Sequence, residues 1–552
     1  MKRYFVQEVF QMRRISIALV LILLLSVMAG CSGTSSDEVS RAVPQITQSA
    51  EEKETAAETE KASSSGIVSD ALATELFTDD DAFPINLDEQ KDAVNITAPG
   101  NYVLTGTLKG QIVVNTAEEG KVKLILNGAD ICCENDACIY VKKADKVVVS
   151  SNEGSINNLN TTGEFAQSDE NKADAVIFSQ EDLNLNGDGV INIVSAYGHG
   201  VVTKDKLKVK DGEVNIVACK KGLSGKDALE IEGGTVNIES RTHSVYSEGD
   251  ITISGGEINI SSSKKDAIHT TENVNITGGT VNILNCIEGI EGLTVTISGG
   301  NVSIVSSDDG INSSSGQSSE GGKGIIGGNP FIADDGADIT ISGGIITINA
   351  GGDGIDSNGT LHMSGGELYI TGPTISADGA IDYATEAIIS GGSVVATGAA
   401  GMAEGFGTNS TQCNILYNCN TTYDGGTDVS LFDSDGNVLI SFTPEKSFSS
   451  VVVSCPEMKI GETYTLVIGE DSAEIEMTSV CYSTGGHGMD MMPSGGMGFG
   501  PGGGPGGHGG PGGPGGNKPV GDRPQGGFNP GQEPPGEFGA GPGGPGGRPQ
   551  GE

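Results

Sequence analysis

Four short acidic phrases in the middle of the chain carry the residue types best suited to chemistry. They read Glu288-Gly289-Ile290-Glu291, Asp309-Gly310-Ile311-Asn312, Asp353-Gly354-Ile355-Asp356 and, one residue longer, Asp378-Gly379-Ala380-Ile381-Asp382. Stacked carboxylates repel one another in a low dielectric, and a bound cation removes that cost. Calcium takes such hard oxygen ligands from flexible loops. A lone Asp-Gly pair indicates an ordinary turn, but the repeated set predicts calcium, held by Glu288, Glu291, Asp308, Asp309, Asn312, Asp353, Asp356, Asp378 and Asp382.

Basic residues occupy similar positions in the earlier repeats. They are aligned by their distance from the preceding apolar run, which ends at Ile216, Ile238 or Ile260. If each repeat forms one coil, equal offsets stack roughly 4.8 Å apart. One edge of the fold is then basic over its early coils and acidic over its later ones. We predict that the basic group binds an anionic ligand through Lys220, Lys221, Arg241, Lys264 and Lys265.

A repeat between residues 183 and 396 must position these side chains. Its phrase is apolar-x-apolar-Ser-Gly-Gly-x-apolar-x-apolar, and the second glycine falls at 234, 256, 279, 300, 344, 366 and 392. Alternation with period two indicates strands, and a fixed step of about 22 residues indicates stacked units. The sequence therefore predicts an all-β parallel β-helix with three short strands per coil. An antiparallel sandwich or barrel is the alternative, but such folds rarely keep so strict a period.

Within the repeat, Gly-Gly predicts a corner that requires positive φ or leaves no room for a side chain. The recurring asparagines at 215, 237, 259 and 282 predict an outward ladder. The interval from Gly300 to Gly344 is twice the period, and its residues 313–335 are rich in Ser and Gly. A weak coil is one interpretation. The lack of strand alternation favours an inserted loop, which would make the coils of Asp309 and Asp353 direct neighbours.

Residues 1–31 have the composition of an export signal. Arg13 and Arg14 precede an apolar run over 15–25 that is too short to span a bilayer. Small residues before Cys31 resemble a bacterial lipoprotein signal, with Cys31 as the lipidated first residue; simple secretory cleavage nearby is the alternative. We expect an extracellular lipoprotein on the outer face of the bacterial cytoplasmic membrane, touching the membrane only through its lipid.

The remaining segments differ in composition. Residues 32–70 are poor in large apolar residues and predict a disordered tether, and the β-helix is expected over 71–396. A small β cap is expected over 397–483, and 484–552 is a Gly- and Pro-rich segment that predicts a disordered tail. Removing Cys31 from the ten cysteines leaves nine, which is compatible with disulfides of undetermined pairing. We expect a monomer.

Composition limits the partners. With 31 Lys and Arg against 73 Asp and Glu, the formal charge is −42, which argues against nucleic acid and anionic membrane surfaces. Aromatic residues make up 5% of the chain and tryptophan is absent. That argues against an aromatic platform for sugar rings, so a bound glycan would have to use polar ladders or metal bridges.

Several phrases together resemble a family of bacterial cell-surface carbohydrate-binding proteins. They are the Ser-Gly-Gly coils, residues 101–106 with 122–128, residues 353–359 and residues 379–383, so that the likeness covers roughly 75–480. The resemblance implies a right-handed, pectate-lyase-like β-helix, bound calcium, and binding of cell-wall glycans such as cellulose and polygalacturonate. No family-wide catalytic residues carry over, and the basic edge is not part of the pattern.

Three function classes remain. The first is a non-catalytic lipoprotein that binds a polysaccharide through calcium and the basic edge. The second is a pectate-lyase-like β-eliminase, which needs a metal and a basic side chain of lowered pKa. Between Asp266 and Glu445 the only basic side chain of the Lys or Arg type is Lys323, so such an enzyme would have to use Lys264, Lys265 or Lys323. The third is a structural spacer or adhesin. We expect binding without catalysis.

Overall fold

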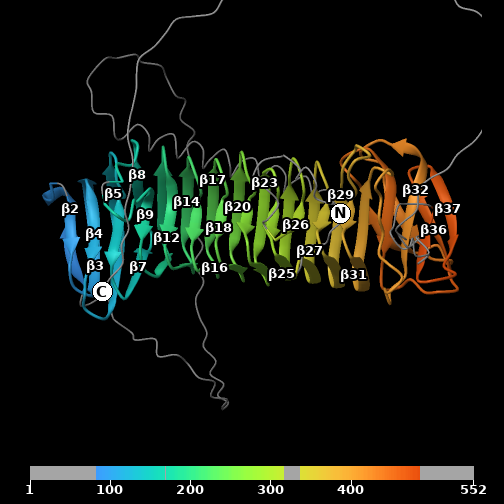
Figure 1. The fold of residues 1–552 in the computed structure, drawn as a ribbon, viewed down its shortest axis with the longest axis horizontal. Helices are drawn as coiled ribbons and strands as arrows, with labels where there is room; N and C mark the ends of the chain where they lie inside the picture. Colours follow the sequence, from blue (N-terminus) through green and yellow to red (C-terminus); the bar gives the residue numbers. More distant parts are fainter. Residues whose placement is uncertain (1–81, 92, 168, 316–335, 485–552) are drawn as a thin grey trace, which may run out of the picture. The chain divides into compact units, whose positions relative to one another are not determined.

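The described part of the chain is a stack of β coils (Figure 1). The computed structural model describes residues 82–91, 93–167, 169–315 and 336–484. It is all-β apart from short turns such as the 3-10 helix Leu87–Glu89, with about 13 coils of about 23 residues. The predicted parallel β-helix is confirmed, and so is its period. The expected signal, tether and tail, with Cys31 and Lys323, lie outside the described residues.

A narrow sheet forms one side of the stack, and each coil contributes one short strand to it. All neighbouring pairs run parallel. Its twelve strands are β2 (Ala93–Ile96), β4 (Gln111–Asn115), β6 (Ile139–Lys143), β9 (Ala175–Ser179), β12 (His199–Thr203), β15 (Leu223–Gly225), β18 (Val245–Ser247), β21 (Ile268–Thr270), β24 (Ile290–Gly292), β26 (Ile311–Ser313), β28 (Ile355–Ser357) and β30 (Ile381–Tyr383).

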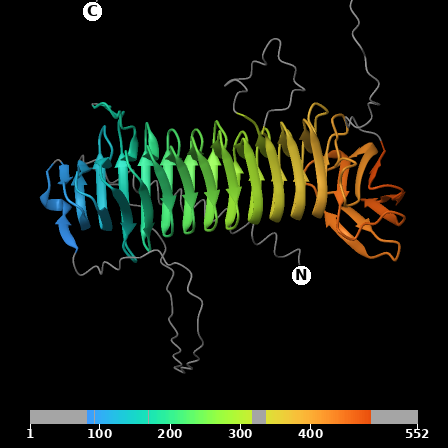
Figure 2. The same cartoon turned by 60° about the horizontal axis from the view of Figure 1, so that its bottom comes forward.

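A broad sheet forms the rest of each coil, with two strands per coil on either side of the glycine corner (Figure 2). In β3, in β5 and from residue 294 onward the two strands join into one. The strands are β1 (Phe83–Asn86), β3 (Gly100–Lys109), β5 (Lys121–Cys133), β7 (Lys146–Ser151), β8 (Ile156–Thr161), β10 (Leu183–Gly187), β11 (Val190–Ser195), β13 (Lys206–Val209), β14 (Glu213–Ala218), β16 (Ala228–Ile231), β17 (Thr235–Ser240), β19 (Asp250–Ile253), β20 (Glu257–Ser262), β22 (Asn273–Ile276), β23 (Thr280–Asn285), β25 (Thr294–Val305), β27 (Asp338–Asn349), β29 (Thr360–Thr371) and β31 (Glu386–Gly398).

The core is a set of columns in which each coil places an aliphatic side chain on the one before it. In the narrow sheet, one column is Val245, Ile268, Ile290, Ile311, Ile355 and Ile381, all fully buried. Burying one such side chain contributes about 1.5–3 kcal/mol relative to leaving it exposed. Because the column must stay in register, it fixes where the polar residues on either side of each isoleucine lie.

The prediction that the coils of Asp309 and Asp353 are direct neighbours is confirmed by this register. Ile311 pairs with Ile355, so the coils before and after residues 314–337 are direct neighbours. The broad sheet agrees, because β25 pairs with β27 across the same interval. The stack therefore continues without a gap, although 316–335 are not described.

The asparagine ladder is also present. Amide groups hydrogen-bond from coil to coil at 2.8–3.0 Å along Asn158, Asn192, Asn215, Asn237, Asn259 and Asn282. Asn192 and Asn215 are nevertheless only 2% exposed, whereas an outward, solvated ladder was predicted. A side chain about 4.8 Å from identical neighbours is largely covered by them, so the ladder is a hydrogen-bonded stack rather than a wet surface.

The C-terminal strands change direction. β35 (Phe448–Ser454) pairs antiparallel with β31 and with β32 (Asn414–Tyr423), and β38 (Cys481–Ser483) pairs with β32. A separate four-stranded antiparallel sheet contains β33 (Val429–Phe432), β34 (Val438–Phe442), β36 (Thr463–Ile468) and β37 (Asp471–Glu476), and it shares a second core with side chains of β31, β32 and β35. In the β33–β34 turn, Asp433 accepts hydrogen bonds from the backbone of Asp435 and Asn437, as expected for a hairpin turn.

The nine cysteines of the described residues are all free thiols. In the same part of the chain, none of the residues forms a helix of the length and apolarity needed to cross a membrane.

The glycine corners give a stability prediction. The second glycine of each corner has positive φ, between 79° and 92°, as predicted. At Gly300 an added Cβ would lie 2.8 Å from the Gly279 carbonyl oxygen of the previous coil. Gly436 has a similar φ of 82°, but its Cβ would meet nothing within 4 Å. We expect Gly300→Ala to destabilise by about 2–4 kcal/mol and Gly436→Ala by about 1–2 kcal/mol.

Thermal unfolding followed by circular dichroism would measure the two variants side by side. Equal shifts in the unfolding midpoint would mean that backbone strain alone, and not contact between coils, requires glycine at the corner.

Candidate functional site

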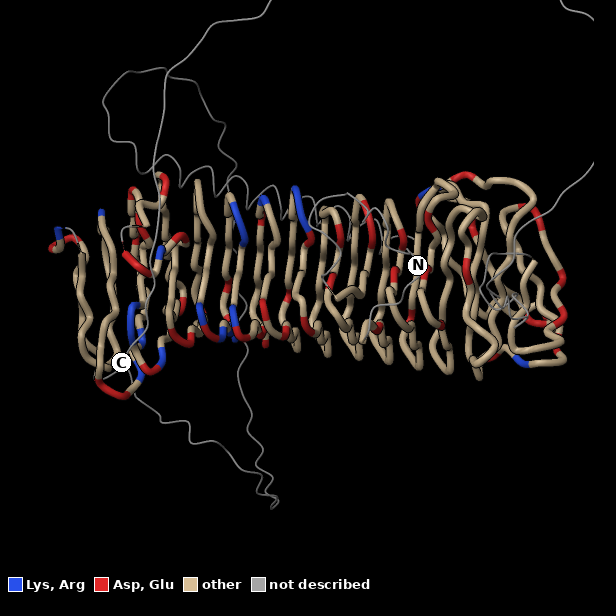
Figure 3. The backbone as a smooth tube through the Cα atoms, in the orientation of Figure 1, with Lys and Arg blue, Asp and Glu red and all other residues tan. Residues whose placement is uncertain are grey.

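Two rows of polar side chains run along the narrow sheet, one on each side of its isoleucine column. The first row lies two residues before each column residue and contains His199, Lys221, His243, Asp266, Glu288, Asp309 and Asp353. The second row lies one residue after it and contains Tyr246, His269, Glu291, Asn312, Asp356 and Asp382. The change from basic to acidic coils along this edge is visible in Figure 3.

The strand register corrects the predicted basic edge. Lys264 and Lys265 precede the first-row position, which Asp266 occupies, and Arg241 likewise precedes His243. The cause is one additional residue in the turn, since eight steps separate Ile260 from Ile268 but seven separate Ile238 from Val245. Counting back from the following isoleucine would have found Asp266 and His269, because Asp266-Ala267-Ile268-His269 has the same form as the acidic phrases. The row therefore becomes acidic one coil earlier than predicted.

The acidic end of the rows brings several predicted residues together. Asp353, Asp356 and Asp382 each offer an oxygen within 4.8 Å of the others. Asp309 lies one coil earlier, and its Oδ1 accepts a hydrogen bond of 2.8 Å from the Asp353 backbone. Asp353 Oδ1 in turn accepts from the backbone of Gly379. Backbone amides thus hold two of the carboxylates in fixed orientations.

The carboxylates at this end have strongly perturbed acidities. Burial, with a further contribution from neighbouring carboxylates, raises the pKa of Asp309, Asp353 and Asp356 to about 8. The same causes raise the pKa of Glu288 to about 7, and burial raises the pKa of Asp382. Within the described residues none of these five forms an ion pair with a basic side chain. Their negative charge is not balanced by the protein.

The remaining predicted acidic residues lie around this group. The amide of Asn312 donates to Glu288 at 3.0 Å, which ties two neighbouring coils together. Asp308 is exposed, and burial of part of its carboxyl with the nearby Asp378 raises its pKa. Asp378 is half-buried one position before Gly379. Together these side chains offer only oxygen donors, which suits calcium better than a softer metal.

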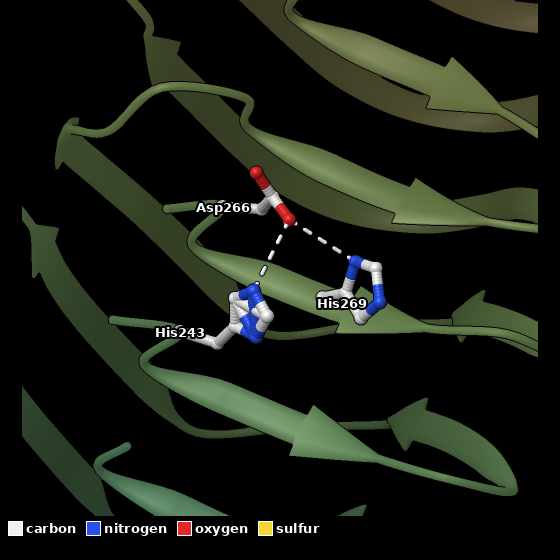
Figure 4. Close-up of side chains that lie close together, drawn as sticks. All are labelled: His243, Asp266 and His269. Atoms are coloured by element: carbon white, nitrogen blue, oxygen red, sulfur yellow. Dashed lines mark ion pairs between the residues drawn. The ribbon is translucent and has the colours of Figure 1, made fainter. Parts of the chain in front are cut away.

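The middle of the rows contains histidines that the sequence interpretation missed (Figure 4). His269 Nδ1 lies 2.6 Å from Glu291 Oε2 and 3.1 Å from Asp266 Oδ2. Burial opposes the charged form of His269, but these two carboxylates raise its pKa to about 9. Glu291, predicted among the calcium ligands, is therefore committed to an ion pair. His199 and His269 are both ion-paired and largely buried.

The basic end is partly neutralised within the protein. Lys220 Nζ lies 3.0 Å from Asp174 Oδ2, which His199 also contacts. Lys221 Nζ lies 2.9 Å from the ring centroid of Tyr246, and burial lowers its pKa to about 8. Arg241, Lys264 and Lys265 are exposed. Of the five predicted basic residues, these last three have side chains open to a ligand.

Part of the chain is similar in sequence to known proteins. Residues 90–336 match the model of a family described as carbohydrate-binding domain-containing protein. The resemblance is confirmed over this segment. A carbohydrate-binding domain-containing protein of Acetivibrio thermocellus is 34% identical over 128 residues, which are 23% of this chain and 45% of that protein. The chain thus spans less than half the length of that relative.

A solved structure of a polysaccharide lyase-like protein from C. thermocellum, as a gadolinium derivative, is 22% identical. The likeness covers 56% of this chain and 92% of that chain with a TM-score of 0.26. The fold assignment rests on the strand pairings described above and takes nothing from this likeness.

The raised pKa values of these carboxyl groups predict how stability depends on pH. A carboxyl whose folded-state pKa is about 8, against an ordinary value of 3.8, binds its proton more tightly when folded. Its stabilising effect is complete below about pH 4 and is lost as the pH rises through 8. In calcium-free buffer the unfolding midpoint should therefore fall from pH 5 to pH 9. Asp356→Asn should stabilise the protein at pH 9 by on the order of 1–3 kcal/mol.

The matched control is Asp227→Asn, which makes the same change at an exposed aspartate on another part of the coil. Its pH profile should follow that of the unmodified protein. If the pH profile of Asp356→Asn also follows that of the unmodified protein, the ionised form of Asp356 does not destabilise the fold.

Proposed function

We propose that this protein is a surface-anchored, non-catalytic lipoprotein that binds an acidic plant cell-wall polysaccharide, such as polygalacturonate, with the help of calcium. Similarity to a carbohydrate-binding family over residues 90–336 supports the general class. The observation that carries the calcium part is the group of half-buried carboxylates without a basic partner at Asp309, Asp353, Asp356 and Asp382.

Calcium would be held where these oxygens converge. The ion takes six to eight oxygen ligands and tolerates irregular geometry, which suits carboxylates drawn from three successive coils. When bound, it neutralises their charge and can also accept a carboxylate oxygen from a ligand. A uronate chain offers one carboxylate per sugar, so that calcium would bridge two groups of like charge that otherwise repel.

The exposed cations would contribute a second contact. Arg241, Lys264 and Lys265 lie on coils that precede the acidic group along the same edge. Five coil-to-coil steps from the Arg241 coil to the Asp382 coil span about 24 Å. A polysaccharide lying along the axis of the stack would contact the basic side chains on the earlier coils and calcium on the later coils. Cellulose, which has no carboxylates, would gain nothing from either contact.

The distances also favour binding over catalysis. A β-eliminase needs its base and its metal at the same sugar. Lys221 has the lowered pKa expected of a base, but five coil steps, about 24 Å, separate it from Asp353. Lys264 and Lys265 are three steps, about 14 Å, from Asp353. None of these lysines reaches the carboxylate cluster.

Calorimetry of the mature protein with polygalacturonate would test the calcium-dependent binding. We expect binding in calcium and about 10-fold or weaker binding in chelator, because bridging through the cation is lost. The double variant Asp353→Asn/Asp356→Asn should bind no better in calcium than in chelator, whereas Asp227→Asn should behave as the unmodified protein. Equal affinity in calcium and chelator would exclude a calcium bridge, and the absence of any binding would leave the structural-spacer class.

A lyase assay separates the second class. Incubation with polygalacturonate and calcium at pH 8–9 should give no product absorbing in the ultraviolet, because Lys221, Lys264 and Lys265 lie at least three coil steps, about 14 Å, from Asp353. The opposite result would be product formation that is lost in the triple variant Lys264→Met/Lys265→Met/Lys323→Met or in Lys221→Met. Either loss would identify the base and replace the non-catalytic proposal.

A further inference from the structure

The histidines in the middle of the two rows form a group whose chemistry differs from that of the acidic end. His243 and Asp266 belong to the first row and His269 to the second, on two adjacent coils (Figure 4). One potential ligand atom from each lies within 4.8 Å of the other two. Two imidazoles and a carboxylate differ from the all-oxygen set that calcium takes. They resemble instead the donor sets that hold zinc and other divalent first-row transition metals.

The distances agree with metal coordination. Two ligands that are each about 2.1 Å from a tetrahedral ion lie about 3.4 Å apart. His243 Nε2 is 3.4 Å from Asp266 Oδ2, and His269 Nδ1 is 3.1 Å from the same oxygen. Glu291 Oε2 lies 2.6 Å from His269 Nδ1 and could serve as a fourth ligand after a small movement. The donor atoms are therefore close enough to share an ion once the two stacked rings turn so that their in-plane nitrogen lone pairs converge.

His243 supplies an independent observation. Both of its ring nitrogens are shielded from solvent and neither has a hydrogen-bond partner. Although Nε2 lies 3.4 Å from Asp266, that contact does not have the geometry of a hydrogen bond. A buried polar group without a partner costs about 1–3 kcal/mol. His269 already has two carboxylate partners, so His243 is the member of the group that lacks one.

The packing around His243 holds the ring in place. Its ring stacks on that of His269 at a centroid distance of 4.6 Å and on that of Tyr246 at 5.4 Å. Asp266 is only 9% exposed, which limits competition from water. The packing thus holds both rings beside Asp266 before any ligand arrives.

We propose that His243, Asp266 and His269, with Glu291 as the fourth ligand, form a binding site for a divalent transition metal, with zinc as the natural probe. The site is separate from the carboxylates of Asp353 and Asp356, because Asp266 and Asp353 are three coil steps, about 14 Å, apart. It does not depend on the proposed polysaccharide. Its two imidazoles select zinc over calcium.

Zinc titration of the chelator-treated mature protein, in buffer with excess calcium, is the direct test. We expect one tight zinc ion and, with Co²⁺ as a spectroscopic probe, visible absorption bands typical of nitrogen and oxygen ligands in a low-coordinate site. His243→Ala should weaken zinc binding about 100-fold or more. No calcium-resistant zinc binding to the unmodified protein would overturn the proposal.

Matched controls use the other histidines of the chain. His362→Ala removes a histidine that pairs with Asp338 on the broad sheet, and the double variant His487→Ala/His508→Ala removes those of the C-terminal segment. Both variants should retain the zinc ion. Zinc binding that survives in His243→Ala, or that is lost in either control, would place the ion elsewhere and overturn the assignment.

Folding and function are separated by two further measurements. His243→Asn keeps a planar polar side chain, and its unfolding midpoint in chelator should match that of the unmodified protein, while zinc should raise the midpoint of the unmodified protein alone. Asp353→Asn/Asp356→Asn should lose calcium-dependent glycan binding yet bind zinc normally. Loss of both ions in that variant would show that the two sites are not separate, against the proposal.

Discussion

Parallel pairing of successive coils is the constraint on which the rest of this structure depends. Strand pairing in the narrow sheet places each residue beside its equivalent on the next coil, about 4.8 Å away. Each side chain must therefore tolerate a near-identical neighbour above and below. Aliphatic residues satisfy this condition without cost, and the fully buried column from Val245 to Ile381 is the result.

Polar residues meet the same condition with different outcomes. Asparagine donates and accepts at once, so the ladder from Asn158 to Asn282 continues without a break. Ionised carboxylates only accept hydrogen bonds, so the stacked Asp309, Asp353 and Asp356 cannot satisfy one another. They either take up protons or require a cation. The outcome for histidine depends on its neighbours. Paired with Asp266 and Glu291, His269 is stabilised, while its neighbour His243 is left without a partner.

The sequence predicted those features that depend on period and on backbone geometry. The Gly-Gly corners, the coil length and the pairing of the Asp309 coil with the Asp353 coil all follow from repeat spacing, and the structure confirms each. The sequence did not predict which side chains would contact one another. One additional residue between Ile260 and Ile268 was enough to put Lys265 where Asp266 belongs, because a shift of one residue in a strand reverses the side that each side chain faces. The ion pairs of His199 and His269 are contacts between coils and leave no mark within a single repeat.

The end of the stack affects how copies of the protein can associate. A parallel stack exposes an unpaired strand edge that could accept another chain in the same direction. Here β35 lies against β31 in the opposite direction, from Val394 opposite Ser454 to Gly398 opposite Ser450. A further parallel coil cannot be added at the position that β35 fills. The antiparallel strand thus acts as a stop at this end of the broad sheet, which limits head-to-tail growth into fibres and favours separate molecules.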